Sequence, residues 1–215
     1  MHVAIAGGHG RIGLMLGRRL AERGAVVRGL IRNPDHAADL REAGVEPLLC
    51  DLEQADALTV AEAVRGVEAI VFAAGAGPGS GAERKRTMDL GGAVKLIEAA
   101  RAESIPRYVM VSAMGAADPP ADSGDVFAEY LRAKAEADRA LAASGLDFTI
   151  VRPGGLTDDP GTGRVAIGES LEPGEVPRAD VAAVLEAVLG APNAVGKTFD
   201  LTAGETPIEV AVAEL

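Results

Sequence analysis

Short apolar runs alternate with longer amphipathic segments along the first two thirds of the chain. The runs are almost continuously apolar, which is typical of strands buried on both faces of a parallel sheet. The expected strands are His2–Ala6, Val26–Ile31, Val45–Leu49, Ala69–Ala73, Tyr108–Ser112 and Asp147–Val151. The segments between them carry the helical period, and the expected helices are Ile12–Arg23, His36–Glu42, Ala55–Val64, Arg84–Glu103 and Val126–Ser144.

This succession of β-α units predicts an α/β fold of the Rossmann type. Its doubly wound parallel sheet would carry helices on both faces, joined by right-handed crossovers. In such sheets the ligand lies beyond the carboxyl ends of the strands. The residues that directly follow each strand are therefore the candidates for a functional site.

The alternation weakens after Val151. The segment Arg152–Pro177 is rich in Gly, Pro and Asp and predicts loops with one short pair of strands. A helix at Arg178–Leu189, a strand at Thr198–Leu201 and a terminal helix at Glu209–Leu215 are expected to follow. We expect residues 1–215 to form a single Rossmann domain, in which residues 152–215 are a small extension on the substrate side.

Composition and charge limit the kinds of molecule that the protein is expected to bind. The formal net charge of −11 disfavours nucleic acid, and no apolar stretch reaches the length of a membrane span. The N-terminus lacks the basic start and long apolar run of a signal peptide, and the single Cys50 suits a reducing compartment. The three histidines show no metal-ligand spacing. We expect a cytoplasmic monomer or homodimer that acts on a small molecule, without metal, nucleic acid or membrane.

A glycine-rich turn follows the first expected strand and opens the first helix. A Cβ at these glycines would obstruct both the sharp turn and the approach of a pyrophosphate, and the helix N-terminus offers free N–H groups to phosphates. The turn predicts a dinucleotide site, with His9 shaping the loop; the alternative is an ordinary β-α loop. The residues expected to contact the cofactor here are Gly7, His9, Gly10, Arg11, Ile12 and Gly13.

The end of the second strand bears on the choice of cofactor. NAD sites usually carry an acidic residue there to bind the ribose hydroxyls, whereas this chain has Arg32. A guanidinium suits a 2′-phosphate, and Arg11 and Arg28 could assist it. The cofactor expected is therefore NADP(H), with NAD(H) less favoured. The alternative is that Arg32 is a solvated surface charge.

A candidate catalytic set lies farther along the chain. Tyr130 and Lys134 are four residues apart, so they share one helix face, and Ser112 ends the fifth strand. A neighbouring ammonium lowers the pKa of a phenol, which could then exchange a proton with a carbonyl oxygen that gains or loses hydride. Ser112 would hold the substrate oxygen. The alternatives are surface residues on an amphipathic helix and a serine that serves as a local cap.

The glycine spacing Gly-x-x-Gly-x-x-Gly and the Tyr-x-x-x-Lys pattern after a strand-end serine resemble the short-chain dehydrogenase/reductases. The likeness extends through Lys95–Ala100, Arg107–Ser112, Leu146–Gly154 and Arg178–Ala182, and is greatest to the atypical subgroup related to flavin and biliverdin reductases. The resemblance implies that Asp51 accepts from the adenine amino group, although Asp51 could equally cap the next helix. It also implies cofactor contacts at Leu52, Ala73, Ala74, Gly75, Lys134, Pro153, Gly154 and Gly155.

The pattern indicates an NADP(H)-dependent oxidoreductase for a small carbonyl, quinone or flavin-like substrate, with Tyr130 as proton donor or acceptor. Two alternatives stay open: a sugar-nucleotide epimerase or dehydratase, and a non-catalytic protein that senses NADP(H). Substrate identity is expected to depend on the loops Gly75–Glu83, Ala113–Asp125 and Leu156–Glu175.

Overall fold

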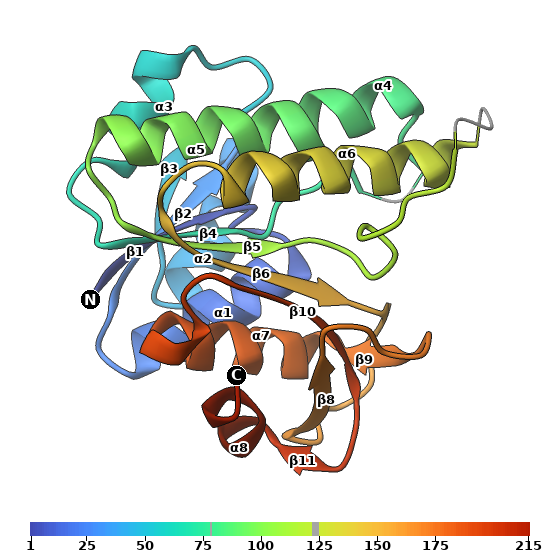
Figure 1. Ribbon diagram of the computed structural model, residues 1–215. Coiled ribbons are helices and arrows are strands. Elements are labelled where there is room, and N and C mark those ends of the chain that lie inside the picture. Colours follow the sequence, from blue (N-terminus) through green and yellow to red (C-terminus); the bar gives the residue numbers. More distant parts are fainter. Residues whose placement is uncertain (78, 122–124) are drawn as a thin grey trace.

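The computed structural model describes residues 1–77, 79–121 and 125–215. Pro78 and residues 122–124, which belong to two of the loops expected to carry specificity, lie outside the described residues. Within the described part, a nine-stranded sheet has the order β11-β8-β10-β6-β5-β4-β1-β2-β3 (Figure 1). Its first six strands along the chain are β1 (His2–Ala6), β2 (Val26–Ile31), β3 (Glu46–Leu49), β4 (Ala69–Phe72), β5 (Arg107–Val111) and β6 (Asp147–Pro153).

These six strands are parallel, and their order 3-2-1-4-5-6 is that of a Rossmann sheet, which confirms the expected fold class. The direction of winding reverses between β1 and β4, and a ligand site is expected at this point. Side chains of β1 alternate between two cores: Val3 and Ile5 pack on one face, and Ala4 and Ala6 on the other. The near-continuous apolar runs therefore reflect burial on both faces.

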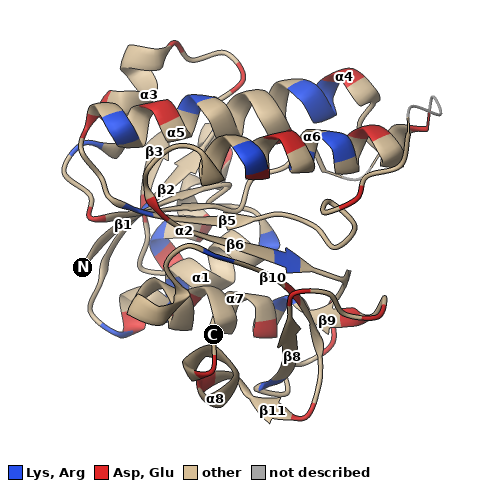
Figure 2. Cartoon of the chain, viewed as in Figure 1, with Lys and Arg blue, Asp and Glu red and all other residues tan. Residues whose placement is uncertain are grey.

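Helices cover both faces of the sheet (Figure 1). One layer contains α3 (Ala57–Val64), α5 (Ala93–Ala102) and α6 (Val126–Ala142), and the other contains α1 (Arg11–Glu22), α2 (Ala37–Glu42) and α7 (Arg178–Leu189). Acidic and basic side chains follow one another along the outer surface of α6 and of the helix beside it (Figure 2). Glu129 accepts there from Arg86 at 2.8 Å and from Arg132 at 2.7 Å.

The helix expected over Arg84–Glu103 is interrupted by a wider turn. It consists of α4 (Ala82–Arg84), a π-helical segment η2 (Lys85–Gly92) and α5. Gly91 and Gly92 end the π segment, and glycine lowers the stability of a regular α-helix. The widened turn shifts the side chains that follow it relative to an unbroken helix, which gives Asp89 its position in the site described below.

The last third of the chain adds strands to the sheet. β10 (Lys197–Ala203) pairs in parallel with β6, and β8 (Arg164–Gly168) and β11 (Thr206–Pro207) continue the sheet in antiparallel orientation. β7 (Gly155–Thr157) pairs with β9 (Glu175–Pro177), which confirms the one short strand pair expected in the glycine-rich segment. The prediction missed β8 and β11, which are short and have partners distant in sequence. A terminal helix α8 (Ile208–Ala213) follows.

No helix of the described chain combines the length and the apolar character that crossing a membrane requires. Among residues 1–77, 79–121 and 125–215, no group of three or more His, Cys, Asp or Glu side chains could hold a metal ion.

Candidate active site

Two adjoining cavities lie beyond the carboxyl ends of the central strands. We call the first, of about 370 Å³, the glycine-turn cavity, because Gly7, His9 and Gly10 line it. The second, of about 680 Å³, we call the tyrosine cavity, because Tyr130, Lys134 and Ser112 line it. Both are lined by Ala73, Ala74, Gly75 and Gly77 of the loop after β4.

The glycine turn leaves no room for side chains at three of its positions, Gly7, Gly8 and Gly13. Gly7 has a φ of +79°, and a Cβ there would lie 2.8 Å from the Ala73 carbonyl oxygen. A Cβ on Gly13 would collide with the carbonyl oxygen of Gly7. Gly10 has an ordinary φ of −61° and caps α1, and its N–H donates to the Gly7 oxygen at 2.8 Å. Sequence reasoning missed Gly8, whose backbone packs against Gly29 of β2.

The N-terminus of α1 faces this turn, and its first-turn N–H groups have no partner within the helix. Arg11 lies at this terminus and pairs with Asp158, in the loop after β7. Arg178 at the start of α7 pairs with the other oxygen of Asp158 at 2.8 Å. The Asp158 carboxylate thus links α1 to α7 by pairing with one guanidinium group from each helix.

Arg32 and Arg84 both line the glycine-turn cavity and share one acid, Glu53. The Glu53 carboxylate lies 3.7 Å from Arg32 and 3.1 Å from Arg84. Burial acts to raise the pKa of Glu53, but hydrogen bonds from Thr87 and Arg84 outweigh it and hold the pKa below its usual value. Asp51 lines the same cavity, so its formal charges balance, and the guanidinium groups of Arg32 and Arg84 are the side chains that could hold an anion there. Sequence reasoning missed Arg84, because it lies on the helix after β4.

Arg28 does not assist Arg32, contrary to expectation. Its guanidinium donates to the Arg65 carbonyl oxygen at 2.8 Å and lies 3.6 Å from Glu46. Arg28 precedes the end of β2 and pairs in register with Glu46 of β3, so it does not line the cavity at the carboxyl end of the strand.

His9 and His36 stack in parallel, with ring centroids 3.6 Å apart, and His9 Nε2 lies 2.7 Å from an oxygen of Asp39. These contacts tie the glycine turn to the segment after β2, as expected of a residue that shapes the loop.

Asp51 and Leu52 line the glycine-turn cavity. Asp51 does not cap the next helix, because α3 begins at Ala57 and is capped by Asp56, whose side chain accepts from the Thr59 N–H. One Asp51 oxygen accepts instead from the Glu53 N–H at 3.0 Å. Lys95 holds the same loop by donating to the carbonyl oxygens of Leu52 and Ala55.

Strand and helix geometry brings the three candidate catalytic residues to the tyrosine cavity. Ser112 directly follows β5, and Tyr130 and Lys134 lie one turn apart on α6. The Lys134 ammonium is almost fully buried, donates to the Val111 carbonyl oxygen at 3.0 Å, and lies 3.3 Å from Asp89 Oδ1. Asp89 Oδ2 accepts from the Ala76 N–H at 3.2 Å. Sequence reasoning missed Asp89 because its placement depends on the π segment.

The pKa of Tyr130 is shifted in the direction opposite to the one expected. Burial raises the pKa of Tyr130, and although Lys134 lowers it, Asp89 and Asp138 add to the increase. The expected net lowering is therefore wrong, and Tyr130 is a phenol at neutral pH. Burial also acts to lower the pKa of Lys134, but Tyr130, Asp89 and Asp138 together raise it, so the amine stays charged.

Ser112 places a buried hydroxyl oxygen at the cavity wall, and this oxygen makes no hydrogen bond of ordinary geometry with any described residue. The hydroxyl does interact with Asp138, whose pKa is raised by burial and lowered by Ser112. Its backbone N–H donates to the Val151 carbonyl oxygen, continuing the β5–β6 ladder. The interpretation as a local cap therefore finds no support in the described hydrogen bonds. A buried hydroxyl without a hydrogen bond of ordinary geometry is costly, and a ligand oxygen would satisfy it.

Pro153, Gly154 and Gly155 line the tyrosine cavity where β6 ends. A Cβ on Gly154 would collide with the Gly174 carbonyl oxygen, and the Gly155 N–H donates to the same oxygen at 2.8 Å. This close contact fixes the loop before β9 as the outer wall of the cavity.

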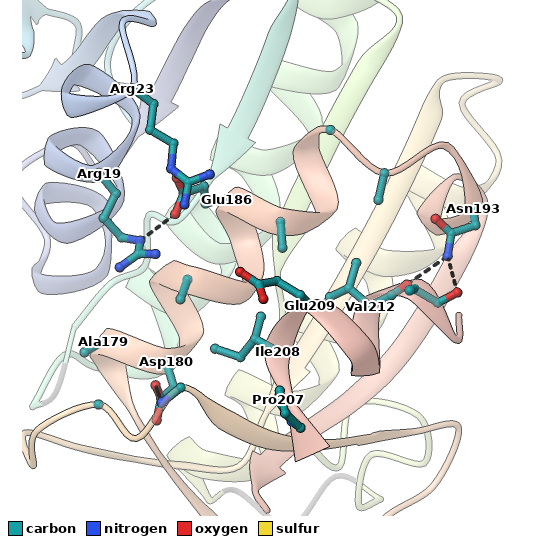
Figure 3. Close-up of a pocket in the computed structure, with 17 residues that line it drawn as sticks. Arg19, Arg23, Ala179, Asp180, Glu186, Asn193, Pro207, Ile208, Glu209 and Val212 are labelled. Atoms are coloured by element: carbon teal, nitrogen blue, oxygen red, sulfur yellow. Dashed lines mark hydrogen bonds and ion pairs between the residues drawn. The ribbon is translucent and has the colours of Figure 1, made fainter. Parts of the chain in front are cut away.

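A hollow of about 820 Å³ lies elsewhere, between α1, α7 and α8 (Figure 3). It is larger than either strand-end cavity, but its two buried carboxylates, Glu186 and Asp180, already have partners. Glu186 pairs with Arg19 at 2.6 Å and Arg23 at 2.5 Å, and Asp180 accepts from the backbone N–H groups of Thr162 and Gly163. None of the residues predicted for the site lines it, so we place the functional site at the strand ends.

Comparisons with known proteins identify the family of the chain. A family model described as NAD(P)H-binding matches residues 7–192. The chain is 39% identical over 216 residues to "Uncharacterized sugar epimerase YhfK" of Bacillus subtilis, with all of both chains covered. The structure of a putative NAD-dependent epimerase/dehydratase from Bacillus halodurans is 36% identical and has a TM-score of 0.93, with all of both chains covered.

ChuY of Escherichia coli O157:H7, described as an anaerobilin reductase, is 27% identical with a TM-score of 0.80, over 94% of this chain and 97% of that one. These matches span the glycine turn, the tyrosine cavity and the extension. The chain therefore belongs to the NAD(P)H-binding family of atypical short-chain dehydrogenase/reductases, which comprises oxidoreductases and epimerases.

Proposed function

We propose that the protein is an NADPH-dependent reductase that transfers hydride to a small carbonyl, quinone or flavin-like acceptor, with Tyr130 as the proton donor. One observation carries the proposal: Tyr130, Lys134 and Ser112 line a single cavity that adjoins the glycine turn. A proton donor, a fixed cation and a hydroxyl thus meet beside the place where a dinucleotide would lie.

The residues of the glycine-turn cavity fit a dinucleotide. The turn excludes side chains at Gly7 and Gly13, and the N-terminus of α1 offers N–H groups for a pyrophosphate. The guanidinium groups of Arg32 and Arg84, which share Glu53, suit the 2′-phosphate of NADP(H) better than the hydroxyl of NAD(H). When bound, NADPH supplies the hydride, and the protein supplies orientation and a proton.

The raised pKa of Tyr130 suits donation of a proton. With a carbonyl acceptor, the carbon gains hydride, the Tyr130 hydroxyl gives its proton to the acceptor oxygen, and the product is an alcohol. The Lys134 ammonium stabilises the phenolate that remains, and the Ser112 hydroxyl donates to the same acceptor oxygen. The phenolate then regains a proton from solvent.

The names of two relatives favour a second candidate, a sugar epimerase. An epimerase that begins by oxidising a sugar hydroxyl needs Tyr130 first as a base. Burial raises the pKa of Tyr130, which favours the acid, and ChuY, which is 27% identical to this chain, is described as a reductase. We therefore rank reduction first.

The test is steady-state oxidation of NADPH with a panel of aldehydes, quinones and free flavins. In parallel, nucleotide sugars are incubated with the protein and either NAD⁺ or NADP⁺, and chromatography detects any epimer. Turnover of one acceptor that Tyr130→Phe abolishes supports the reductase. Epimer formation without net cofactor oxidation supports the second candidate, and tight NADPH binding without either reaction supports a sensor.

A further inference from the structure

The tyrosine cavity is rich in positive charge, although the chain as a whole is acidic. Among the described residues, its lining has three cations, Lys85, Lys134 and Arg178, and one acid, Asp89. The formal net charge of the chain is −11. Local positive potential in an acidic protein favours an anionic ligand at that place.

Two of the three cations already have anionic partners. Lys134 pairs with Asp89, and Arg178 shares Asp158 with Arg11. Lys85 makes no ion pair with any described residue. Its ammonium donates to the Gly77 carbonyl oxygen at 3.0 Å and lies 5.0 Å from the centroid of the Tyr130 ring. Lys85 is therefore the cation available to an acceptor close to the proton donor.

The rest of the wall is apolar. Phe127 is 61% exposed and Leu156 is 37% exposed, and both line the cavity together with Val111, Met114 and Leu131. Phe127 also contacts the Tyr130 ring, with centroids 5.9 Å apart. An acceptor with an apolar body would cover these side chains and leave an acidic group near Lys85.

We propose that Lys85 binds an acidic group of the acceptor, so that the cavity selects apolar carbonyl compounds that carry a carboxylate or a similar anion. This rests on the proposed function, because it assigns the tyrosine cavity to the acceptor. A charge-assisted hydrogen bond from the lysine would fix the acceptor beside Tyr130.

The experiment measures binding rather than turnover. Naphthalene-2-carboxylate and its neutral match, naphthalen-2-ylmethanol, are titrated into the protein saturated with NADP⁺. The chain has no Trp, so the fluorescence of each probe is read without a tryptophan background. We expect the carboxylate to bind roughly tenfold more tightly than the alcohol, the size of effect that a hydrogen bond to a charged group gives.

Lys85→Ala should remove this preference, and Lys85→Arg should keep it. Lys197→Ala, which removes an exposed lysine at the start of β10, controls for the loss of one positive charge. The affinity for NADP⁺ should be the same in all four proteins. Equal binding of the two probes by the native protein, or failure of both to bind, overturns the proposal.

Two further outcomes reassign the residue and also overturn the proposal. If Lys85→Ala weakens NADP⁺ itself, the lysine binds the cofactor. If the preference survives in Lys85→Ala and disappears in Arg178→Ala, the anion site is at the start of α7. The reductase proposal can fail separately. If the preference for the carboxylate depends on Lys85 but no acceptor receives hydride, the proposed anion site stands and the proposed reaction is wrong.

Discussion

Asp89 Oδ1 lies 3.3 Å from the ammonium nitrogen of Lys134, and both side chains are almost completely buried. The lysine therefore acts on Tyr130 as one half of an ion pair, not as a free cation. A lone ammonium would favour the phenolate, whereas a pair with little net charge leaves burial as the dominant influence. This relationship explains why Tyr130 stays protonated at neutral pH.

The first prediction concerns the pH dependence of reduction in Asp89→Asn. The native rate should fall as pH rises through the pKa of Tyr130, because only the protonated phenol can donate. Asp89 is one of the groups that raise this pKa, together with Asp138, while Lys134 lowers it. Asparagine removes the charge but keeps an acceptor for Lys134. The alkaline decline of kcat should therefore begin at lower pH.

The pH profile of kcat, measured with saturating NADPH and one confirmed acceptor, checks this expectation. Glu136→Gln is the control, because Glu136 lies on the outer surface of α6 and pairs with Arg86. Superimposable profiles for the native protein and Asp89→Asn would show that the ion pair does not tune the tyrosine.

The second prediction separates the roles of Tyr130 and Lys134. Tyr130→Phe removes one hydroxyl, so kcat should fall by roughly 10²–10⁴-fold, the contribution of a general acid, while cofactor affinity changes little. Lys134→Ala leaves Asp89 buried without its cation, so turnover, cofactor binding and thermal stability should fall together. Kinetics, calorimetry and melting curves measure the three quantities. Full turnover in Tyr130→Phe would mean that water or the acceptor supplies the proton.

The third prediction concerns cofactor choice. Arg32→Asp replaces a cation at the glycine-turn cavity with an anion, which should repel a 2′-phosphate and accept from a ribose hydroxyl. The native protein should bind NADPH more tightly than NADH, and the variant should reverse this order. Calorimetry with both cofactors gives the affinities. Arg28→Asp is the matched control, since Arg28 faces Arg65 and Glu46 rather than the cavity. Equal native affinities for the two cofactors would contradict the prediction.

The fourth prediction concerns stability. Tyr108 in β5 is fully buried, and its hydroxyl has no hydrogen-bond partner among the described residues. Tyr108→Phe removes this polar group and should leave the free energy of unfolding unchanged or raise it, by up to about 1–3 kcal/mol.

Burial raises the pKa of Tyr108 well above the usual value. The unfolded chain therefore loses the proton first, so native stability should decline above about pH 10.

Chemical denaturation at neutral and at alkaline pH tests both parts of this prediction. Tyr108→Phe should show a smaller alkaline decline than the native protein. A loss of more than about 1 kcal/mol at neutral pH would reveal a hydrogen-bond partner of the hydroxyl, such as a bound water.

Local patterns predicted most of the fold. Six apolar runs became β1 to β6 with boundaries that agree within two residues, because burial on both faces leaves a continuous apolar signal. The glycine turn and the Tyr130–Lys134 pair were found because their spacing follows from one turn and one helix face. The strands β8 and β11 were missed, since their pairing with residues far along the chain leaves little local signal.

The missed parts of the site share one cause, which is contact between distant segments. Asp89 reaches Lys134 through a π-helical turn, and Arg84 reaches Glu53 from the helix after β4. The pKa of Tyr130 was predicted in the wrong direction because the sequence shows the neighbouring lysine but neither its burial nor its acidic partner. Helix spacing predicts which residues are neighbours on one helix. The pKa of a side chain depends also on the charged groups of every other element packed against that helix.

The pairing of β10 with β6 has a consequence for folding during synthesis. β1 to β5 and the helices between them precede β6 along the chain and can fold as it leaves the ribosome, since synthesis runs from the N-terminus. The outer edge of β6 stays open until residues 197–203 have been synthesised. An unpaired edge is a site for aggregation. A truncation that removes only the last two strands should therefore yield insoluble protein, although every residue of the glycine turn and of α6 is retained.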